Sequence, residues 1–275
     1  HDPSGDLYRL RKALEEEWKL MDLRFEQEII ISIQKKLREA DWKVTVAVDY
    51  LGNVISIYPG LKESLYGIAI DIGSTTIAAH LCSLRNGNVL ASAGVMNPQI
   101  RFGEDLMSRV SYIMMNPGGE KELTQVVREA VYQLVKNVCK QNQCELEEIA
   151  EITFVGNPIM HHLLLGINPE ELGGAPFALA TDESFRLSAR KLDLNFHTNT
   201  QCYVLPCIAG HVGADTAGMI LSEEISHRQD ITLLVDVGTN AEIVLGNSER
   251  MLAASSPTGP AFEGAQISSG QRAAP

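Results

Sequence analysis

The sequence contains two short segments whose residue types suit the binding of a phosphate group. Asp71-Ile72-Gly73-Ser74-Thr75-Thr76 follows one apolar run, and Asp236-Val237-Gly238-Thr239-Asn240 follows another, 165 positions later (236 minus 71). In each segment a glycine lets the backbone approach an anion, and neighbouring N–H groups and hydroxyls can donate to phosphate oxygens. The aspartate that ends each apolar run can hold a divalent cation, directly or through water. The pair predicts two facing turns that clamp a nucleotide phosphate and its metal.

One such segment alone is weak evidence, because an Asp-x-Gly-Ser turn is commonly a β-turn closed by its own aspartate. Here the segment occurs twice, at equivalent points of two similar stretches, which is the pattern of an internal repeat. The second copy is followed by a glycine-rich stretch from Ser255 to Gly264, in which Gly259 is a candidate nucleotide contact. The repetition favours a nucleotide site over two unrelated turns.

The residues around the two segments predict the strands that would position them. β-prone runs at 66–71 and 77–81 flank the first turn, and Asn86-Gly87 indicates a hairpin into a third strand. Runs at 231–236 and 241–245 repeat this arrangement around the second turn. The intervening elements are helices over 103–115 and 119–141, a strand over 151–155, a helix after Pro158, a strand before Pro206 and a helix over 213–225. This order predicts an α/β fold in which three antiparallel strands continue into parallel ones, with helices on both faces of the mixed sheet.

The first 60 residues form a different pattern. Apolar residues at helical spacing predict helices over 7–18 and 25–37, and alternating residues at 44–48 and 54–57 predict a hairpin. We expect a small α+β module in which Trp18 and Trp42 pack into the core; a docking or dimer surface is the alternative. The expected units are therefore 1–62, 63–225 and the beginning of another at 226–275.

Composition excludes several classes of partner. The formal net charge of −12 repels polyanions, which argues against nucleic acid and anionic membranes. No apolar run reaches the ~20 residues of a membrane span. The five cysteines include no C-x2-C pair, so we expect reduced, buried thiols in a soluble, cytoplasmic protein. The chain begins at His1 without an initiator Met and stops at Pro275 after a glycine-rich stretch, so we expect that both ends are cut.

The two phosphate segments resemble the first and second phosphate motifs of the actin, sugar-kinase and heat-shock-chaperone ATPase (ASKHA) superfamily. Further strings resemble one branch of it, the reductive activators of corrinoid proteins. These strings are Asn97-Pro98-Gln99, Gly103-Glu104-Asp105 with Ser108-Arg109, Val155-Gly156-Asn157-Pro158 with Met160-His161-His162, Pro206 with residues 209–215, and residues 269–275. The resemblance spans about residues 30–275. It implies a ribonuclease-H-like, actin-like ATPase fold, and ATP hydrolysis that drives the return of an oxidised Co(II) corrinoid to Co(I) on the corrinoid protein of a methyltransferase system.

The resemblance also implies roles for single residues. Asp71 and Asp236 would hold Mg²⁺, while the phosphates of ATP would be bound by Gly73, Ser74, Thr75, Thr76, Gly238, Thr239 and Asn240. Asp215 or His211 would orient the attacking water. We favour Asp215, because a carboxylate is ionised at pH 7 and can accept a hydrogen bond from water, although a helix cap is the other interpretation. Adjacent helical residues point about 100° apart, so His161 and His162 are expected to be surface or capping residues rather than metal ligands.

Two departures from this family and three alternatives remain. Family members carry an N-terminal [2Fe–2S] domain, which we expect in the full-length protein, but this chain has no C-x4-C-x2-C run for its ligands. Part of the C-terminal lobe is also expected beyond Pro275. The alternatives are another ASKHA enzyme, either a small-molecule kinase or the activator of a 2-hydroxyacyl-CoA dehydratase, and a catalytically silent nucleotide-binding scaffold that docks a partner through residues 6–60. Assembly into a homodimer is left open.

Overall fold

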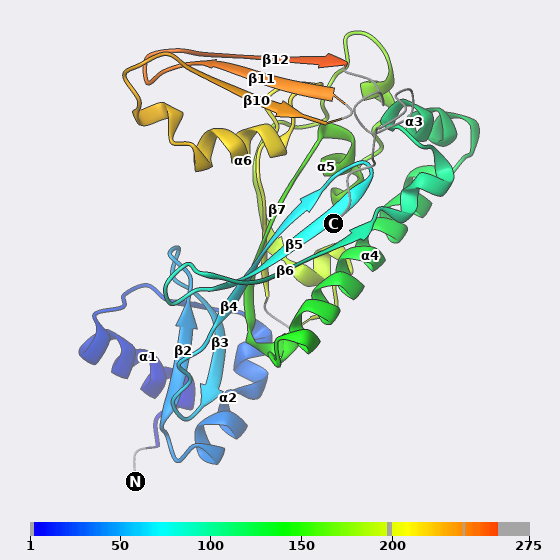
Figure 1. The fold of residues 1–275 in the computed structure, drawn as a ribbon. Helices are drawn as coiled ribbons and strands as arrows, with labels where there is room; N and C mark the ends of the chain where they lie inside the picture. Colours follow the sequence, from blue (N-terminus) through cyan, green and yellow to red (C-terminus); the bar gives the residue numbers. More distant parts are fainter. Residues whose placement is uncertain (1–2, 197–199, 239, 258–275) are drawn as a thin grey trace.

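The computed structural model describes residues 3–196, 200–238 and 240–257. The described residues form three sheets: a three-stranded sheet near the N-terminus, a six-stranded sheet in the middle and a second three-stranded sheet at the far end (Figure 1). No helix in these described ranges combines the length and the apolar character needed to cross a membrane.

The N-terminal module packs two amphipathic helices against its sheet. Leu10, Leu14, Ile29, Ile33 and Ile57 are buried together between the helices and the strands. The elements are α1 (Asp6–Trp18), β1 (Arg24–Phe25), α2 (Gln27–Glu39), β2 (Val44–Val48) and β3 (Asn53–Pro59), with the strands in the order β1-β3-β2. The predicted α+β composition is therefore observed.

Two details of the predicted module are wrong. Phe25 does not begin the second helix, because Arg24 and Phe25 pair with β3 and the backbone amide of Arg24 donates to the carbonyl of Gly52 at 2.9 Å. The tryptophans are not core residues: Trp18 is 71% exposed at the end of α1, and Trp42 is 37% exposed with the guanidinium of Arg9 above its ring. The leucines and isoleucines of the two helices already fill the space beneath the sheet.

The central sheet has the predicted mixed topology, in the strand order β6-β5-β4-β7-β9-β8. Three strands form an antiparallel meander, and β7 and then β9 continue the sheet in parallel to β4. The strands are β4 (Tyr66–Ile72), β5 (Thr76–Ser83), β6 (Val89–Met96), β7 (Ile149–Gly156), β8 (Phe185–Ser188) and β9 (Gln201–Val204). The antiparallel edge strand β8 is an addition that the sequence pattern did not indicate.

Helices cover both faces of this sheet, as expected. On one face, Ile68, Ile70 and Ile72 of β4 are buried in a large core that includes the apolar stripe of α4. The alternation of a strand turns Asp71 to the opposite face, next to Val155 of β7. The helices of this region are α3 (Leu106–Met115), α4 (Gly119–Gln141), α5 (Pro158–Leu165) and α6 (Ala214–Ser222). A Cβ built at Gly218 of α6 would lie 3.1 Å from the side chain of Val155, so α6 covers the face that carries Asp71.

The third sheet repeats the meander around the second phosphate segment. Its antiparallel strands are β10 (Thr232–Val237), β11 (Asn240–Gly246) and β12 (Met251–Pro257). Val244 is buried on one face, while Leu233, Val235, Leu245 and Leu252 are exposed on the other. The fold class predicted from the sequence is thus confirmed, with the two phosphate segments at the ends of β4 and β10.

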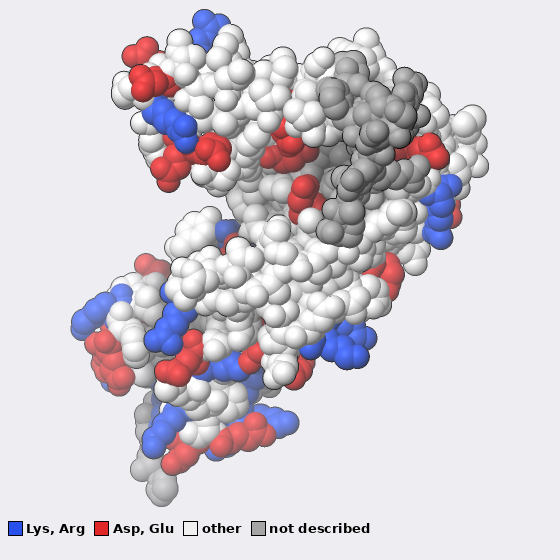
Figure 2. All heavy atoms as spheres, viewed as in Figure 1, with Lys and Arg blue, Asp and Glu red and all other residues white. Residues whose placement is uncertain are grey.

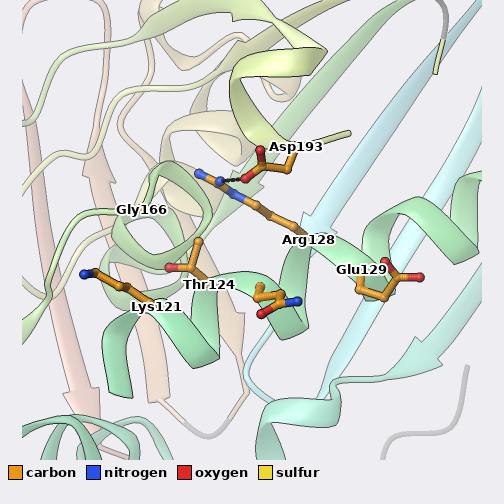
Figure 3. Close-up of a pocket in the computed structure, with 7 residues that line it drawn as sticks. Lys121, Thr124, Arg128, Glu129, Gly166 and Asp193 are labelled. Carbon is orange, nitrogen blue, oxygen red and sulfur yellow. Dashed lines mark hydrogen bonds and ion pairs between the residues drawn. The ribbon is translucent and has the colours of Figure 1, made fainter. Parts of the chain in front are cut away.

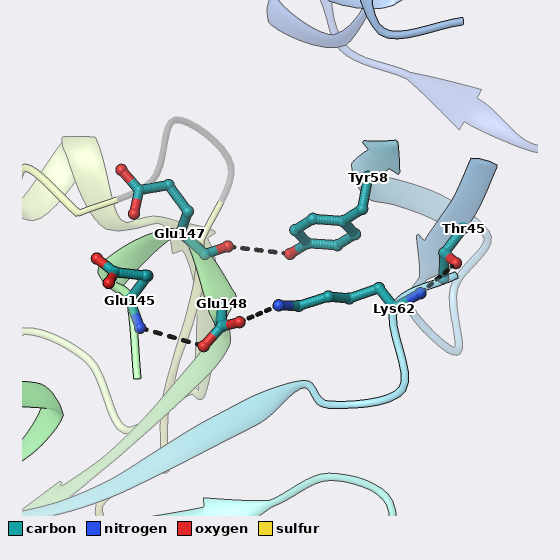
Figure 4. Close-up of polar contacts among 6 residues, drawn as sticks. All are labelled: Thr45, Tyr58, Lys62, Glu145, Glu147 and Glu148. Carbon is teal, nitrogen blue, oxygen red and sulfur yellow. Dashed lines mark hydrogen bonds and ion pairs between the residues drawn. The ribbon is translucent and has the colours of Figure 1, made fainter. Parts of the chain in front are cut away.

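The N-terminal module contacts the central sheet where β7 begins (Figure 4). Lys62 forms an ion pair with Glu148, and the hydroxyl of Tyr58 donates to the carbonyl of Glu147 at 3.0 Å. The ion pair raises the pKa of Lys62 above its ordinary value, and burial raises the pKa of Tyr58. Ile55 and Ala150 are buried together beside these polar contacts. The module is therefore attached to the strand whose other end reaches the first phosphate segment.

We expect Lys62→Met to lower the free energy of unfolding by about 1–2 kcal/mol, because it leaves the mostly buried carboxylate of Glu148 without its charged donor. Lys35→Met is the control, since the Lys35–Glu39 pair is exposed and should contribute about 0.5 kcal/mol or less. Because the pKa of Lys62 is higher in the folded protein than in the unfolded chain, its stabilising effect is complete below the unfolded-state pKa. The effect is lost only as the pH rises through the folded-state pKa. The difference between the variants in urea unfolding should therefore persist from about pH 6 to about pH 9, and equal losses would contradict the attachment.

Candidate functional site

The first phosphate segment is a tight turn that joins β4 to β5. The amide of Gly73 donates to the carbonyl of Thr76 at 3.0 Å and closes the turn. A Cβ at Gly73 would lie 2.7 Å from that same carbonyl oxygen, so only glycine fits without a shift of the backbone. Asp71 precedes the turn by two residues; solvent reaches its side chain, although the protein around the cleft partly desolvates the carboxylate.

The carbonyl groups of this turn bond to the protein behind it. Nδ2 of Asn97 donates to the Gly73 carbonyl at 2.8 Å, and Nη2 of Arg109 donates to the Ser74 carbonyl. The amide of Asn97 also donates to the Thr75 carbonyl at 2.7 Å. In a trans peptide the N–H points opposite to the C=O, so the amides of Ser74 and Thr75 point away from Asn97 and Arg109. Neither amide has an acceptor among the described residues, which leaves two neighbouring donors for an anion.

The second phosphate segment has a related but shorter turn. The amide of Gly238 donates to the carbonyl of Asn240 at 2.8 Å, and Asp236 stands opposite Glu242 in the β10–β11 register. The predicted contacts Thr239 and Gly259 lie outside the described residues. Both described turns therefore follow the end of an aspartate-bearing strand, as the sequence repeat predicts.

Four carboxylates from the two lobes share one electrostatic environment. Burial, and then the charges of Asp215 and Asp236, raise the pKa of Asp71 to about 6. Burial and the charge of Asp236 also raise the pKa of Asp215, and the same two aspartates act with burial to raise that of Glu242. Acidic side chains are visible where the hollow between the β10–β12 sheet and the central body narrows (Figure 2). The structure thus brings Asp71, Asp215 and Asp236 together from separate elements.

This arrangement suits a cation that is only partly held by the protein. Within the described ranges, no three acidic, histidine or cysteine side chains come close enough to form a complete metal site. Mg²⁺ in nucleotide sites is commonly held by one or two carboxylates, with waters and phosphate oxygens as its other ligands. Asp71 and Asp236 fit that mode of binding.

Asp215 begins α6 and faces the same carboxylates. Its Oδ1 accepts from the amide of Thr216 at 2.7 Å, whereas its Oδ2 has no protein partner among the described residues. The N-cap of the helix is Gly213, and a Cβ there would lie 2.6 Å from the carbonyl of Gly156. The glycine thus lets the start of α6 approach the end of β7. Asp215 caps one amide and still offers one oxygen to water, so the two interpretations of this residue are compatible.

His211 lies elsewhere in the cleft. Its exposed ring is 4.4 Å from the ring of Phe177. It lines a cavity of about 130 Å³ together with Asn157 from the first lobe and Asn240 and Glu242 from the second. The charge of Asp215 acts on Asp71 directly, whereas His211 lies on the wall of this cavity, so we still expect Asp215 to be the better placed of the two water-orienting candidates.

The structure corrects the expectation for the paired histidines. His161 and His162 are 3% and 1% exposed, not surface or capping residues. Nε2 of His162 accepts from the amide of Ala180 at 3.0 Å, and burial lowers the pKa of His161 to about 4. Every residue of α5 from Pro158 to Leu164 is buried, so the helix is enclosed on all sides. The histidines are neutral core residues.

The cysteines agree with the prediction of buried thiols. Cys139, Cys144, Cys202 and Cys207 are buried, Cys82 is partly exposed, and all five are free thiols. Burial raises the pKa of Cys202 and of Cys207 to about 12 each, which keeps these two side chains protonated at neutral pH.

A larger cavity of about 460 Å³ lies beside α4, but its lining does not suit nucleotide chemistry (Figure 3). Nε of Arg128 donates to the Leu164 carbonyl at 2.9 Å, and its Nη1 pairs with Asp193 at 2.6 Å. The guanidinium is therefore already engaged by the protein. No residue of either phosphate turn lines this cavity.

Sequence reasoning missed three residues of the site. Glu242 is placed by the register of β11, and Asn97 and Arg109 bind the back of the first turn. Asn97 and Arg109 belong to strings that resemble the family, but nothing in their spacing indicates that they bond to turn carbonyls 22 to 35 positions earlier in the chain. Glu242 had a usable signal, since a six-residue spacing from Asp236 across a tight hairpin puts both side chains on one face.

Comparison with known proteins gives consistent matches along the chain. Residues 66–228 match the family model described as the RACo middle region, and residues 230–275 match the C-terminal domain of RACo, the ASKHA domain. Residues 1–64 match the RACo linker region.

Similar proteins of known name support the same relationship. The chain is 32% identical over 211 residues to the corrinoid activation enzyme RamQ of Eubacterium limosum, covering 77% of this chain and 35% of RamQ. It is 26% identical over 220 residues to the [Co(II) methylated amine-specific corrinoid protein] reductase of Methanosarcina barkeri, covering 77% of this chain and 39% of the reductase. The chain therefore spans less than two fifths of the length of these relatives.

A solved structure, the reductive activator for corrinoid,iron-sulfur protein, superposes with a TM-score of 0.88 at 34% identity. The match covers 99% of this chain and 44% of that one. It confirms the resemblance noted in the sequence and the mixed α/β architecture.

We expect Asp71→Asn to weaken the binding of Mg-ATP to the complete protein by about tenfold or more, because it would remove one of the two carboxylates predicted to hold the metal. The control is Glu17→Gln, which removes an exposed carboxylate of α1. Titration calorimetry with magnesium present should show the loss for Asp71→Asn only. Equal affinities for the two variants would remove Asp71 from the metal site.

The raised pKa of Asp71 predicts that the substitution that weakens Mg-ATP binding also stabilises the nucleotide-free protein. The folded protein penalises the ionised form, so the penalty is present above about pH 6 and disappears below the ordinary pKa of 3.8. In the absence of nucleotide, Asp71→Asn should therefore melt at a higher temperature than the unmutated protein at pH 7.5, and the two should converge near pH 4. A lower melting temperature for the variant at pH 7.5 would contradict the electrostatic account.

Proposed function

This chain belongs to the RACo family, and from that premise we propose that it is the nucleotide-handling part of an ATP-dependent activator that returns a Co(II) corrinoid protein to Co(I). One observation carries the proposal: β4 and β10 have Asp71 and Asp236 near their ends, and in the turn after β4 the amides of Ser74 and Thr75 have no acceptor among the described residues. The names of the two curated relatives support the corrinoid part of it.

The residues divide the work of holding the nucleotide. The amides of Ser74 and Thr75 donate to phosphate oxygens, and we assign the same role to Thr76, Thr239, Asn240 and Gly259. The amides of Gly73 and Gly238 close the two turns, so we assign to these glycines the close approach of the backbone to the phosphates. Asp71 and Asp236 hold the Mg²⁺ that accompanies ATP. When bound, Mg²⁺ supplies charge neutralisation for the transferred phosphoryl group. Phosphoryl transfer needs little from the protein beyond this positioning and neutralisation.

Asp215 orients the attacking water in this proposal. Its Oδ2 has no protein partner among the described residues, and the first turn of α6, which contains Asp215, lies beside the carboxylates that we assign to the metal. Burial raises the pKa of Asp215, so its carboxylate accepts a proton more readily than an ordinary aspartate does. His211 is the second candidate, on the wall of the smaller cavity.

The electron for the cobalt centre comes from another part of the protein in this proposal. Among the described residues, which include all five cysteines, no group of three or more cysteine, histidine or acidic side chains could hold a metal ion, so we assign the [2Fe–2S] group to a domain outside this chain. The corrinoid protein would bind a surface whose shape depends on ATP, because a ligand moves an equilibrium only by its differential affinity for the two states.

Several coarser features are proposed on the same basis. We propose three units, at 1–62, 63–225 and 226–275, because the N-terminal module and the central sheet have separate cores. We also propose a cytoplasmic location, supported by five free thiols, and no nucleic-acid or membrane partner, supported by the net charge of −12. Homodimer formation is proposed from the resemblance alone.

The alternative functions predict different products. A small-molecule kinase would transfer the γ-phosphoryl group of ATP to its acceptor and release little free phosphate with or without that acceptor, whereas an activator ATPase transfers the group to water and releases phosphate. A silent scaffold would bind ATP and release none. The activator of a 2-hydroxyacyl-CoA dehydratase would hydrolyse ATP too, but would not form Co(I) on a corrinoid protein.

We expect Asp215→Asn to lower the kcat for ATP hydrolysis by about 10²–10³-fold in the complete protein, with a smaller change in KM, because water orientation acts on the chemical step. His211→Gln should change kcat by about threefold or less, because the ring borders the cavity and not the metal-site carboxylates. Phosphate release measures both. A larger loss for His211→Gln would reverse the assignment.

The corrinoid step is tested by the visible spectrum of the cobalt centre under anaerobic conditions. The complete protein with ATP, Mg²⁺ and a low-potential reductant should form Co(I), and Asp71→Asn should not. Residues 1–275 alone should fail, because their five cysteines do not gather into a group that could hold a metal cluster in the described structure. Co(I) formation by this chain alone would overturn the division of labour, and failure of the complete protein with several corrinoid partners would overturn the proposed function.

A further inference from the structure

Arg109 is a fully buried cation whose hydrogen-bond acceptors are all neutral. It lies in α3, and its side chain has 0% exposure. Nε donates to the Gly103 carbonyl at 3.1 Å, Nη1 to Oε1 of Gln99 at 3.3 Å, and Nη2 to the Ser74 carbonyl. Among the described residues, no carboxylate forms an ion pair with it.

The surroundings of Arg109 offset its charge only in part, because Asp105 acts on it through its charge but forms no ion pair with it. Burial lowers its pKa to about 10, which still leaves the guanidinium cationic at neutral pH. Asp105 is the acid that acts on it most, but its Oδ1 is already the N-cap acceptor for the amide of Ser108 at 2.7 Å. The positive end of the α3 dipole is also nearby, since Arg109 is in the first turns of that helix. A buried charge without a partner is costly, so an anion nearby would be favoured.

The turn in front of Arg109 offers a place for that anion. The guanidinium bonds to the Ser74 carbonyl, and the N–H of the same peptide, which belongs to Thr75, points the opposite way. A charged donor on the carbonyl polarises the peptide and strengthens its N–H as a donor. No other described lysine or arginine bonds to residues 73–76. Four acidic residues surround the cleft, so Arg109 is the cation that opposes their charge next to this turn.

We propose that Arg109 is the positioning residue and buried counter-charge of the phosphate site. It holds the Ser74 carbonyl inward, so that the amides of Ser74 and Thr75 meet the polyphosphate of the nucleotide, and its charge offsets the acidic lining for that anion. This role rests on the proposed function, because it takes the ligand to be a nucleotide polyphosphate. It is additional to Mg²⁺, which neutralises the phosphates from the carboxylate side.

The competing interpretation is a clamp that only stabilises the turn. If Arg109 were only a clamp, replacing it would change the affinities for all ligands by the same factor. If it is a counter-charge, replacing it lowers the affinity more for a ligand with more phosphates. Arg109→Lys keeps the charge and loses the forked contacts, while Arg109→Met loses both. Gln99→Glu is independent of these two, because it brings a carboxylate to Nη1 and cancels the charge with Arg109 still in place.

The test measures the affinities of the complete protein for ATP, ADP and adenosine by calorimetry. Arg109→Met should lower the affinity for ATP by about tenfold or more, lower the affinity for ADP by less, and leave the affinity for adenosine within about twofold of the unmutated value. Arg109→Lys should leave the affinity for ATP within about threefold. Should Arg109→Met not fold, Gln99→Glu decides: it should weaken ATP by about tenfold with adenosine within about twofold.

Equal fold losses for ATP and adenosine, or an unchanged ATP affinity in Gln99→Glu, would overturn the counter-charge. An unmutated protein that does not bind ATP would overturn the proposed function instead, so the two failures are distinguishable. Circular dichroism of each nucleotide-free variant verifies the fold before titration.

Discussion

Repulsion between Asp71, Asp215 and Asp236 is the constraint on which the rest of the site depends. The three carboxylates come from β4, from the first turn of α6 and from β10. Besides burial, the charges of Asp215 and Asp236 raise the pKa of Asp71, and the charge of Asp236 raises the pKa of Asp215. An arrangement of like charges persists only when the surrounding structure holds it, since each group would be more stable in water. The core behind β4 is large, and a Cβ would not fit at Gly213, where α6 meets the end of β7. Packing thus holds the acids together, and a cation is what such a site favours.

β7 connects this constraint with the N-terminal module. Its first residues contact the module through Ala150 and the Lys62–Glu148 pair, and its last residue, Gly156, contacts both the end of β4 and the N-cap of α6. A Cβ at Gly156 would lie 2.8 Å from the carbonyl of Ile72, so the strand closely abuts the first phosphate segment. One continuous strand therefore joins the two places. Contact of this kind is a route for coupling only if an element adopts two states, and ATP between the two lobes is the ligand that would select between them.

The sequence predicted the elements that have a strong period and missed those that have none. The meanders around both phosphate segments follow from alternation and turn residues, and the same pattern places Asp71 and Asp236 at strand ends. β8 is four residues long and half-buried throughout, so it has no alternation to read. The burial of His161 and His162 had a signal, because a helix with apolar residues on all sides is enclosed in a core. Arg109 had none: its function depends on which carbonyl its guanidinium reaches, and only the fold decides that.

The charges of the cleft also suggest why the nucleotide would act as a bridge between lobes. In the proposed function, the first lobe offers two amides backed by Arg109 and the carboxylates of Asp71 and Asp215, whereas the second offers the carboxylates of Asp236 and Glu242. Neither lobe alone balances a polyphosphate and its cation: the first has donors for the anion, and the second adds carboxylates that require the cation. Mg-ATP satisfies both at once, so its binding favours lobes held together. Hydrolysis divides the anion into two parts, each of which makes fewer of these contacts, and the preference for the closed arrangement falls accordingly.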